Sequence, residues 1–196
     1  MTSIDSNTTL FWFRRDLRLK DNAGLFHALK EQTKVQAIFI FDTNILGKLE
    51  DKSDRRVSFI HHSLASLSDE LQKAGAGLLV LIGEPAEIFM QLKPAAVYAN
   101  HDYEPYGRRR DEAIRNILEK RKITFKTFKD QVIFEKDEVV KDDGMPYSIF
   151  TPYSRKWKEK LKLNPAYSSS YSTERHFANL KKNKTSFHSL SYGYWL

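Results

Sequence analysis

Charged and aromatic side chains gather near the N-terminus in the segment WFRRDLRLKDN, directly after a short apolar run. Guanidinium and carboxylate groups that lie this close can pair through two parallel hydrogen bonds. We therefore expect an ion-paired loop in which Asp16 and Asp21 hold the arginines, Arg18 in particular. Arg14 and Arg15 come directly after the apolar run, which makes them candidates for binding an anionic ligand.

A second group lies in the segment NHDYEPYGRRRD, which begins at Asn100. Its tyrosines can stack on a planar ring, and the N-terminus of the helix expected here favours an anion. The three arginines in the first turn oppose the helix dipole, which indicates a use in pairing or binding. The alternative is a loop between a strand and a helix whose basic first turn is solvated.

A third segment, residues 130–157, is rich in aromatic residues and ends in FTPYSRKW. Its first twenty residues are polar, and the sequence DDG within them predicts a turn. We expect the aromatic residues to anchor a linker onto the preceding domain, which is a structural role rather than a ligand-binding one.

Several kinds of catalytic site are missing from the sequence. It contains no cysteine and no His-x-x-x-His pair, so we expect neither a thiolate nor a metal site. It also has no Gly-x-Ser-x-Gly motif and no glycine-rich phosphate loop. The missing loop counts against one alternative function, an adenine-nucleotide-binding module of the universal-stress or electron-transfer-flavoprotein type.

The elements that position these segments follow from apolar periodicity. Five short apolar runs alternate with helical patterns, and they lie at residues 8–13, 35–41, 78–82, 95–99 and 123–128. A long helix is expected to run to about Ala74, with Asp54 or Ser53 as its N-cap and apolar residues three and four apart. This alternation predicts an α/β fold, a doubly wound, Rossmann-like, five-stranded parallel sheet with buried strands. Such sheets bind ligands at the carboxyl ends of their strands, here residues 13–15, 41–43, 82–84 and 100–103.

The positive charge of the chain lies entirely in its C-terminal part. Residues 1–150 hold 23 basic and 23 acidic residues, whereas residues 151–196 hold 9 and 2, a net charge of +7. We expect a domain in residues 1–130 and a basic, partly flexible connector in residues 131–196. Residues 164–196 show no apolar periodicity, so we expect them to be loosely held. The basic part could contact nucleic acid or an acidic surface, but a solvated linker is the preferred interpretation.

No signal peptide and no apolar run of about 20 residues is present, which predicts a cytoplasmic protein with no membrane partner.

Together, the patterns WFRxDLRxxDN, YEPYGxxxD and FTPYxxxW resemble the DNA photolyase/cryptochrome family, most closely bacterial class I cyclobutane pyrimidine dimer photolyases. The resemblance runs from Trp12 to about Trp157. It implies the N-terminal α/β domain and the start of the connector. Family members carry a second, helical domain that binds FAD and the DNA lesion, and the resemblance implies that this chain stops before it. The chain alone would then be non-catalytic, whereas its parent would be a lyase acting on damaged DNA.

In this family the α/β domain holds a light-harvesting antenna chromophore, which is methenyltetrahydrofolate, 8-hydroxy-5-deazaflavin or FMN, and some members have none. Folate-binding members have Asn-Glu where this chain has Tyr106 and Gly107. The resemblance therefore implies FMN or 8-hydroxy-5-deazaflavin rather than methenyltetrahydrofolate, with an anionic tail near Arg55 or Arg56. By position, the chromophore-binding residues would be Arg14, Arg15, Phe41, Asp42, Leu46, Arg55, Asp102, Glu104 and Tyr106. A cryptochrome photoreceptor would carry the same domain, so that alternative stays open.

Overall fold

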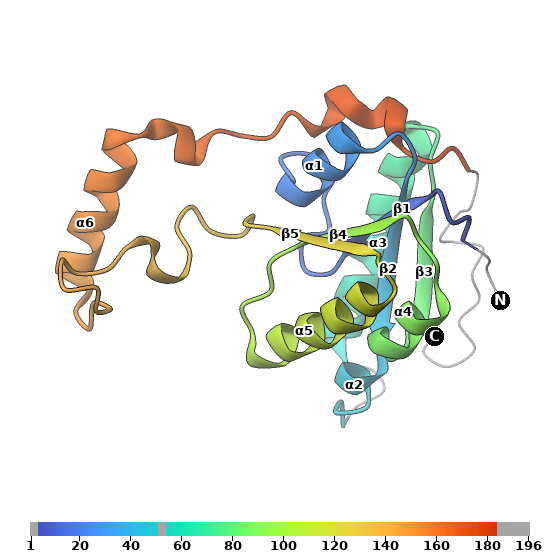
Figure 1. Ribbon diagram of the computed structural model, residues 1–196, viewed down its shortest axis with the longest axis horizontal. Coiled ribbons are helices and arrows are strands. Elements are labelled where there is room, and N and C mark those ends of the chain that lie inside the picture. Colours follow the sequence, from blue (N-terminus) through green and yellow to red (C-terminus); the bar gives the residue numbers. More distant parts are fainter. Residues whose placement is uncertain (1–3, 51–53, 184–196) are drawn as a thin grey trace.

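A five-stranded parallel sheet forms the centre of the molecule, as the sequence predicted (Figure 1). The computed structural model describes residues 4–50 and 54–183. The strands lie in the order β3-β2-β1-β4-β5, so the chain winds outward in both directions from β1. Their bounds are β1 Thr9–Phe13, β2 Val35–Asp42, β3 Leu78–Gly83, β4 Ala96–Asn100 and β5 Thr124–Phe128.

Helices cover both faces of the sheet, which explains why the strands are nearly continuous apolar runs. Phe11 and Phe13 of β1 pack in the layer of α1 and α3, while Leu10 and Trp12 pack in the layer of α4 and α5. A short helix, α2, follows β2 directly. The helix bounds are α1 Ala23–Glu31, α2 Thr43–Leu46, α3 Arg55–Lys73, α4 Pro85–Gln91 and α5 Pro105–Lys120.

The long helix α3 begins and ends where the sequence predicted. The Asp54 carboxylate accepts a hydrogen bond from the Arg56 backbone N–H at 2.8 Å, which is an N-cap. After the last turn, Gly75 has a φ of 75°, a left-handed conformation that favours glycine. Between these ends, Leu64, Leu67 and Leu71 are buried against the sheet.

The two edge strands, β3 and β5, are less buried than the sequence predicts, and in β5 Phe125 alone is buried. The apolar run of β3 suggests a strand covered on both faces, but Ile82 is 45% exposed. The reason is that β3 is an edge strand with β2 as its single neighbour. The hydrophobicity of a strand therefore does not reveal its place in the sheet.

After β5 the chain leaves the sheet, forms a separate arm, and returns (Figure 1). The arm contains η1 Lys136–Glu138, α6 Phe150–Leu163 and η2 Pro165–Ser168. The Phe134 ring packs against Trp157, with ring centroids 5.5 Å apart, and against Tyr167 at 4.9 Å. The expectation that aromatic residues of segment 130–157 anchor the linker onto the domain is wrong for Phe134 and Trp157, because Phe134 packs against Trp157 and Tyr167 within the arm.

The return segment, residues 171–183, packs onto the α/β domain. It contains η3 Thr173–Asn179, which lies beside α1. Thr173 and Leu180 are buried, and the Lys181 backbone N–H donates to the Val35 carbonyl at 2.8 Å. The expectation of a loosely held stretch is therefore wrong for these residues. Residues 184–196, on which the rest of that expectation falls, lie outside the described part.

Across residues 4–50 and 54–183, no helix has the length and apolar character needed to cross a membrane. The proposed division of the chain at residues 130 and 131 stays a prediction.

Candidate functional site

A cavity of about 480 Å³ opens at the carboxyl ends of β1 and β2, beside α2, the start of α3 and the loop before α5. Sites for small molecules usually measure about 300–1,000 Å³. Eight of the nine residues predicted to bind a chromophore line this cavity, namely Arg14, Arg15, Phe41, Asp42, Leu46, Asp102, Glu104 and Tyr106.

The ninth residue, Arg55, is not among the lining residues, and its neighbour Arg56 takes that place. Consecutive residues on a helix point about 100° apart, so only one of the two arginines can face the cavity. The Arg56 guanidinium pairs with the Asp54 carboxylate at 2.6 Å, while the Arg56 side chain stays 75% exposed. Arg56 can therefore still turn toward a ligand at the rim.

Aromatic and aliphatic side chains form much of the cavity wall. The rings of Phe39 and Phe41 pack edge to face, with centroids 5.1 Å apart. Trp12, Leu46 and Ile60 complete this part of the lining. Such walls suit a flat, largely apolar ring system.

The Arg110 side chain, which is only 8% exposed, lies among three carboxylates. Its guanidinium is 3.1 Å from the Asp102 and Asp111 carboxylates and 4.0 Å from that of Asp42. It also lies over the Trp12 ring, 4.9 Å from the ring centroid. With Arg14, which pairs with Asp111, two buried cations face three carboxylates, so they offset most of the negative charge at the floor of the cavity.

The sequence analysis did not separate Arg110 from Arg108 and Arg109. The distinguishing signal is helical spacing, because Tyr106, Arg110 and Ile114 lie four residues apart on one face of α5. Ile114 is fully buried, so this face is directed inward.

The phenol of Tyr106 donates a hydrogen bond to the Asp42 carboxylate at 2.7 Å. Burial and this bond raise the pKa of Tyr106 to about 12, so the phenol keeps its proton. The Lys48 ammonium lies 5.5 Å from the centre of the Tyr106 ring. A cation therefore lies beside the Tyr106 ring at the rim of the cavity.

Close packing explains why a glycine stands at position 107. A β-carbon at this position would overlap with the Asp102 carboxylate. That carboxylate is held in place, because it accepts hydrogen bonds from the Glu104 backbone N–H at 3.2 Å and from Arg110 at 3.1 Å. Glycine therefore allows Asp102 to lie against the first turn of α5.

The two arginines after β1 differ in how freely their side chains can bind a ligand. The Arg14 side chain is 7% exposed, pairs with Asp111 at 2.6 Å and donates to the Asn100 carbonyl oxygen. The Arg15 side chain is 55% exposed and pairs with Glu104 at 3.1 Å. Arg15 is therefore the one of the two that can reach an anionic ligand at little cost.

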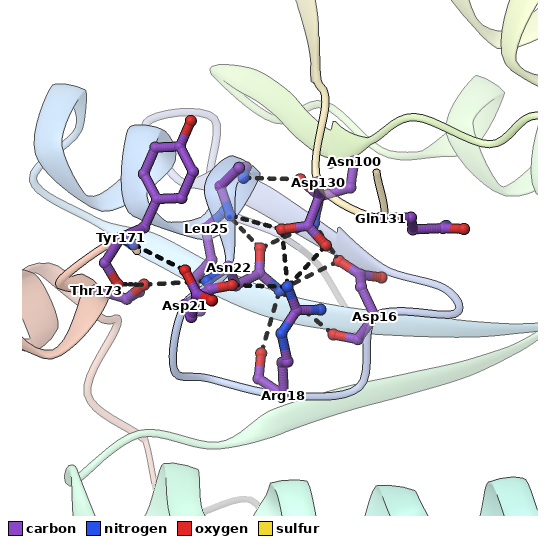
Figure 2. A network of polar contacts seen from close by, with 12 residues as sticks. Asp16, Arg18, Asp21, Asn22, Leu25, Asn100, Asp130, Gln131, Tyr171 and Thr173 are labelled. Carbon is purple, nitrogen blue, oxygen red and sulfur yellow. Dashed lines mark hydrogen bonds and ion pairs between the residues drawn. The ribbon is translucent and has the colours of Figure 1, made fainter. Parts of the chain in front are cut away.

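The loop after β1 is held by amide groups rather than by the predicted pairing of Asp16 with an arginine side chain. The buried Asp16 carboxylate accepts hydrogen bonds from the side-chain amides of Asn22 and Asn100, at 3.2 and 2.6 Å (Figure 2). It also accepts from the Arg14 backbone N–H at 2.9 Å. This network fixes the strand ends that line the cavity.

Arg18 pairs with a residue far away in the sequence, which corrects the expected pairing with Asp21. Its guanidinium lies 2.9 Å from Asp130, and that carboxylate also accepts from the Ala23 backbone N–H at the start of α1 (Figure 2). The Asp21 carboxylate accepts instead from the Tyr171 backbone N–H at 2.8 Å. Both ends of the arm are thus bound at the N-terminus of α1.

An open parallel sheet with a cavity of this size at its strand ends is typical of α/β domains that bind small molecules. The family model described as DNA photolyase matches residues 9–170. The chain therefore belongs to the DNA photolyase family.

Similar proteins support this assignment. A deoxyribodipyrimidine photo-lyase from Synechococcus sp. is 36% identical over 160 residues, covering 80% of this chain and 33% of the relative. An archaeal photolyase from Sulfolobus tokodaii, solved with two FAD molecules and implying a novel light-harvesting cofactor, is 39% identical. Its TM-score is 0.61, and the match covers 65% of this chain and 30% of that one.

A bacterial class III photolyase from Agrobacterium tumefaciens has a TM-score of 0.74 and 26% identity, covering 94% of this chain and 37% of that one. The chain thus spans about a third of the length of the relatives it matches. These matches establish the family without separating class I from class III, so the class I resemblance stays a prediction.

Proposed function

We propose that this chain is the light-harvesting domain of a deoxyribodipyrimidine photolyase, with a flavin or deazaflavin chromophore in the 480 Å³ cavity. The observation that carries the proposal is the lining, which combines aromatic walls, a floor whose carboxylates contact the buried Arg110, and cations at the rim. In the whole enzyme, blue light would drive electron transfer from reduced FAD to a pyrimidine dimer in DNA. The antenna would pass its excitation energy to that FAD.

A flavin fits the residues present in the cavity. Its flat tricyclic ring would pack against Phe41, Leu46 and the Tyr106 ring, and its anionic tail would meet Arg56 or Lys48 at the rim. Guanidinium groups suit a phosphate, because they bind its oxygens through two hydrogen bonds. The Sulfolobus tokodaii photolyase, which contains two FAD molecules, supports the same class of ligand.

Folate fits less well, because its pterin ring needs acceptors for its N–H donors. The cavity carboxylates of Asp42 and Asp102 are already within reach of Arg110, and Glu104 pairs with Arg15. A buried donor without a partner costs about 1–3 kcal/mol, or about one to two orders of magnitude in affinity.

Titration of the purified chain with FMN, FAD, 8-hydroxy-5-deazaflavin and methenyltetrahydrofolate, followed by fluorescence, tests the proposal. We expect one of the flavin-type ligands to bind and folate to bind at least tenfold more weakly. Tight folate binding without flavin binding would contradict the pocket assignment. Binding of ATP in preference to every chromophore would support the adenine-nucleotide alternative instead.

The neighbouring arginines provide a matched pair of variants. Arg56→Ala should weaken flavin binding about fivefold, the effect of losing about 1 kcal/mol from one exposed charge contact. Arg55→Ala removes the same charge one residue away and should leave the affinity unchanged. Equal effects of both variants would mean that Arg56 does not contact the tail.

A further inference from the structure

Helix α6 lies apart from the sheet, and the arm itself covers one side of it (Figure 1). Trp157 packs on Phe134 from this side. The Lys160 ammonium donates to the Glu138 carbonyl oxygen and lies 5.1 Å from the centre of the Phe134 ring. These contacts fix the rotation of α6 about its axis, and they leave the opposite side toward solvent.

Three basic residues lie on that opposite side. Arg155, Lys158 and Lys162 are spaced three and four residues apart, so their side chains share one helix face. All three are exposed, and no ion pair found in residues 4–50 and 54–183 involves them. We call these three residues the outer basic face.

Two other basic residues of the arm have acidic partners, unlike the three of the outer basic face. Lys156 pairs with Asp142 at 3.1 Å, and Lys129 pairs with Glu138 at 2.7 Å. Helix α6 holds five basic residues and one acidic residue, Glu159. Like charges three and four residues apart on a helix repel one another, and a bound polyanion would relieve this repulsion.

We infer that the outer basic face of Arg155, Lys158 and Lys162 contacts the phosphate backbone of duplex DNA. This inference rests on the proposed function, which makes DNA the polyanion that the whole enzyme meets. The seven residue steps from Arg155 to Lys162 cover about 10 Å of helix. Duplex DNA carries about six phosphate charges over that distance, enough to meet all three cations. The contact positions the duplex without reading its sequence.

An anionic membrane surface is the competing polyanion, and the structure favours DNA over it. A helix that lies on a membrane needs a free apolar face opposite its charges. In α6 most of that side is occupied, because Trp157 packs on Phe134 within the arm and Leu161 is half-buried. Phe150, at the first position of the helix, is exposed, but one ring does not make a free apolar face.

Fluorescence anisotropy with a labelled, lesion-free 20-base-pair duplex tests the inference on the full chain. Non-specific binding of this kind has a dissociation constant on the order of 10⁻⁴ to 10⁻⁶ M and weakens steeply with salt. The variant with Arg155→Gln, Lys158→Gln and Lys162→Gln should reduce the slope of log K against log salt by about 2 to 3, since each phosphate contact contributes about 0.9.

The matched control carries Lys20→Gln, Lys93→Gln and Lys120→Gln, which remove the same charge from exposed positions on the α/β domain. This control should keep the parental slope, and thermal melts should show that both variants fold. No binding to the duplex, equal losses in both variants, or an unchanged slope in the α6 variant would each overturn the inference. Binding to anionic vesicles without binding to the duplex would overturn it in favour of a membrane.

Flavin titration of the same α6 variant separates the two proposals. We expect it to bind flavin like the parent, because α6 does not line the cavity. Loss of flavin binding in every form of the chain, with DNA binding intact, would count against the antenna function and leave the DNA contact standing.

Discussion

The Arg110 guanidinium contacts three carboxylates at the cavity floor, and this arrangement depends on the residue next to one of them. Asp102 can approach the first turn of α5 because Gly107 has no β-carbon. At the scale of residues, the position of the Asp102 carboxylate is thus set by one buried cation and by the absence of a β-carbon at position 107.

The Gly107→Ala variant should be less stable than the parent by about 1–3 kcal/mol, the usual cost of overpacking. The new methyl group overlaps with the Asp102 carboxylate, which Arg110 and the Glu104 backbone hold in place. Urea unfolding would measure the change. Adding Gly107→Ala to Asp102→Ala should cost much less, because the overlapping group is gone; equal costs in both backgrounds would exclude this cause.

Most of the residues that the sequence predicts for the chromophore site line one cavity, but their partners were not predicted. The strand ends placed Phe41, Asp42 and Asp102 in one cavity, because the carboxyl ends of parallel strands meet at one edge. It missed that Arg56 rather than Arg55 faces the cavity, since this choice depends on the rotation of α3. The pairing of Arg18 with Asp130 could not be predicted from the sequence either, because the two residues are 112 positions apart.

At the scale of elements, the N-terminus of α1 is hydrogen-bonded by Asp130, a residue that follows the edge strand β5. The Asp130 side chain, which is 2% exposed, accepts from the Ala23 backbone N–H at 2.9 Å and pairs with Arg18. The start of a helix leaves backbone N–H groups unpaired. A carboxylate there accepts a hydrogen bond from one of them and is attracted by the positive end of the helix dipole.

The Asp130→Ala variant should therefore lose about 1–2 kcal/mol of stability, a typical cost of removing a cap. Hydrogen exchange should also become faster in the first turn of α1. The control is Asp137→Ala, which removes an exposed carboxylate from the arm. Equal losses in the two variants would show that the bond to Ala23 contributes little.

His27 of α1 makes the stability of the fold depend on pH. Its ring stacks on Phe128 of β5 with centroids 4.5 Å apart. Burial lowers the pKa of His27 below its ordinary value of 6.5, with Glu31 opposing the shift and Lys30 adding to it. The folded state then binds fewer protons than the unfolded state, so this contribution is complete above pH 6.5 and is lost as the pH falls below it.

Unfolding free energies between pH 7.5 and 5.5 would measure this effect. The His27→Phe variant keeps a ring on Phe128 but cannot titrate, so its stability should fall less steeply than that of the parent. The exposed His62 serves as the control, and His62→Gln should keep the parental slope. Parallel curves for His27→Phe and the parent would rule out His27 as the cause.

The elements themselves were largely predictable, because apolar runs and caps are local signals. Asp54 and Gly75 marked the ends of α3 correctly. The position of β3 at the edge of the sheet was not predictable in this way, since an edge strand packed by helices has the same composition as a central one.

At the scale of the whole molecule, the return segment contributes a buried residue to the core of the α/β domain. Leu180 is 2% exposed and packs in the same cluster as Leu29 and Val35. Its neighbours are lysines and asparagines, so the sequence carries no periodic signal for its burial.

The Leu180→Ala variant should lose about 2–4 kcal/mol, the usual cost of truncating a buried leucine. Leu163→Ala is the control, because that side chain is 81% exposed at the end of α6. It should change stability by less than about 0.5 kcal/mol. Urea unfolding of both variants checks this, and a small loss at Leu180 would mean that the return segment opens without disturbing the domain.

Because Asp130 and Tyr171 are both bound at the start of α1, the arm between them is a closed loop of fixed end-to-end separation. The entropy of closing a loop grows only with the logarithm of its length, about 0.6 kcal/mol for each doubling. Insertions or deletions within the arm should therefore leave the domain nearly as stable as before. The length of the arm can thus change during evolution independently of the cavity.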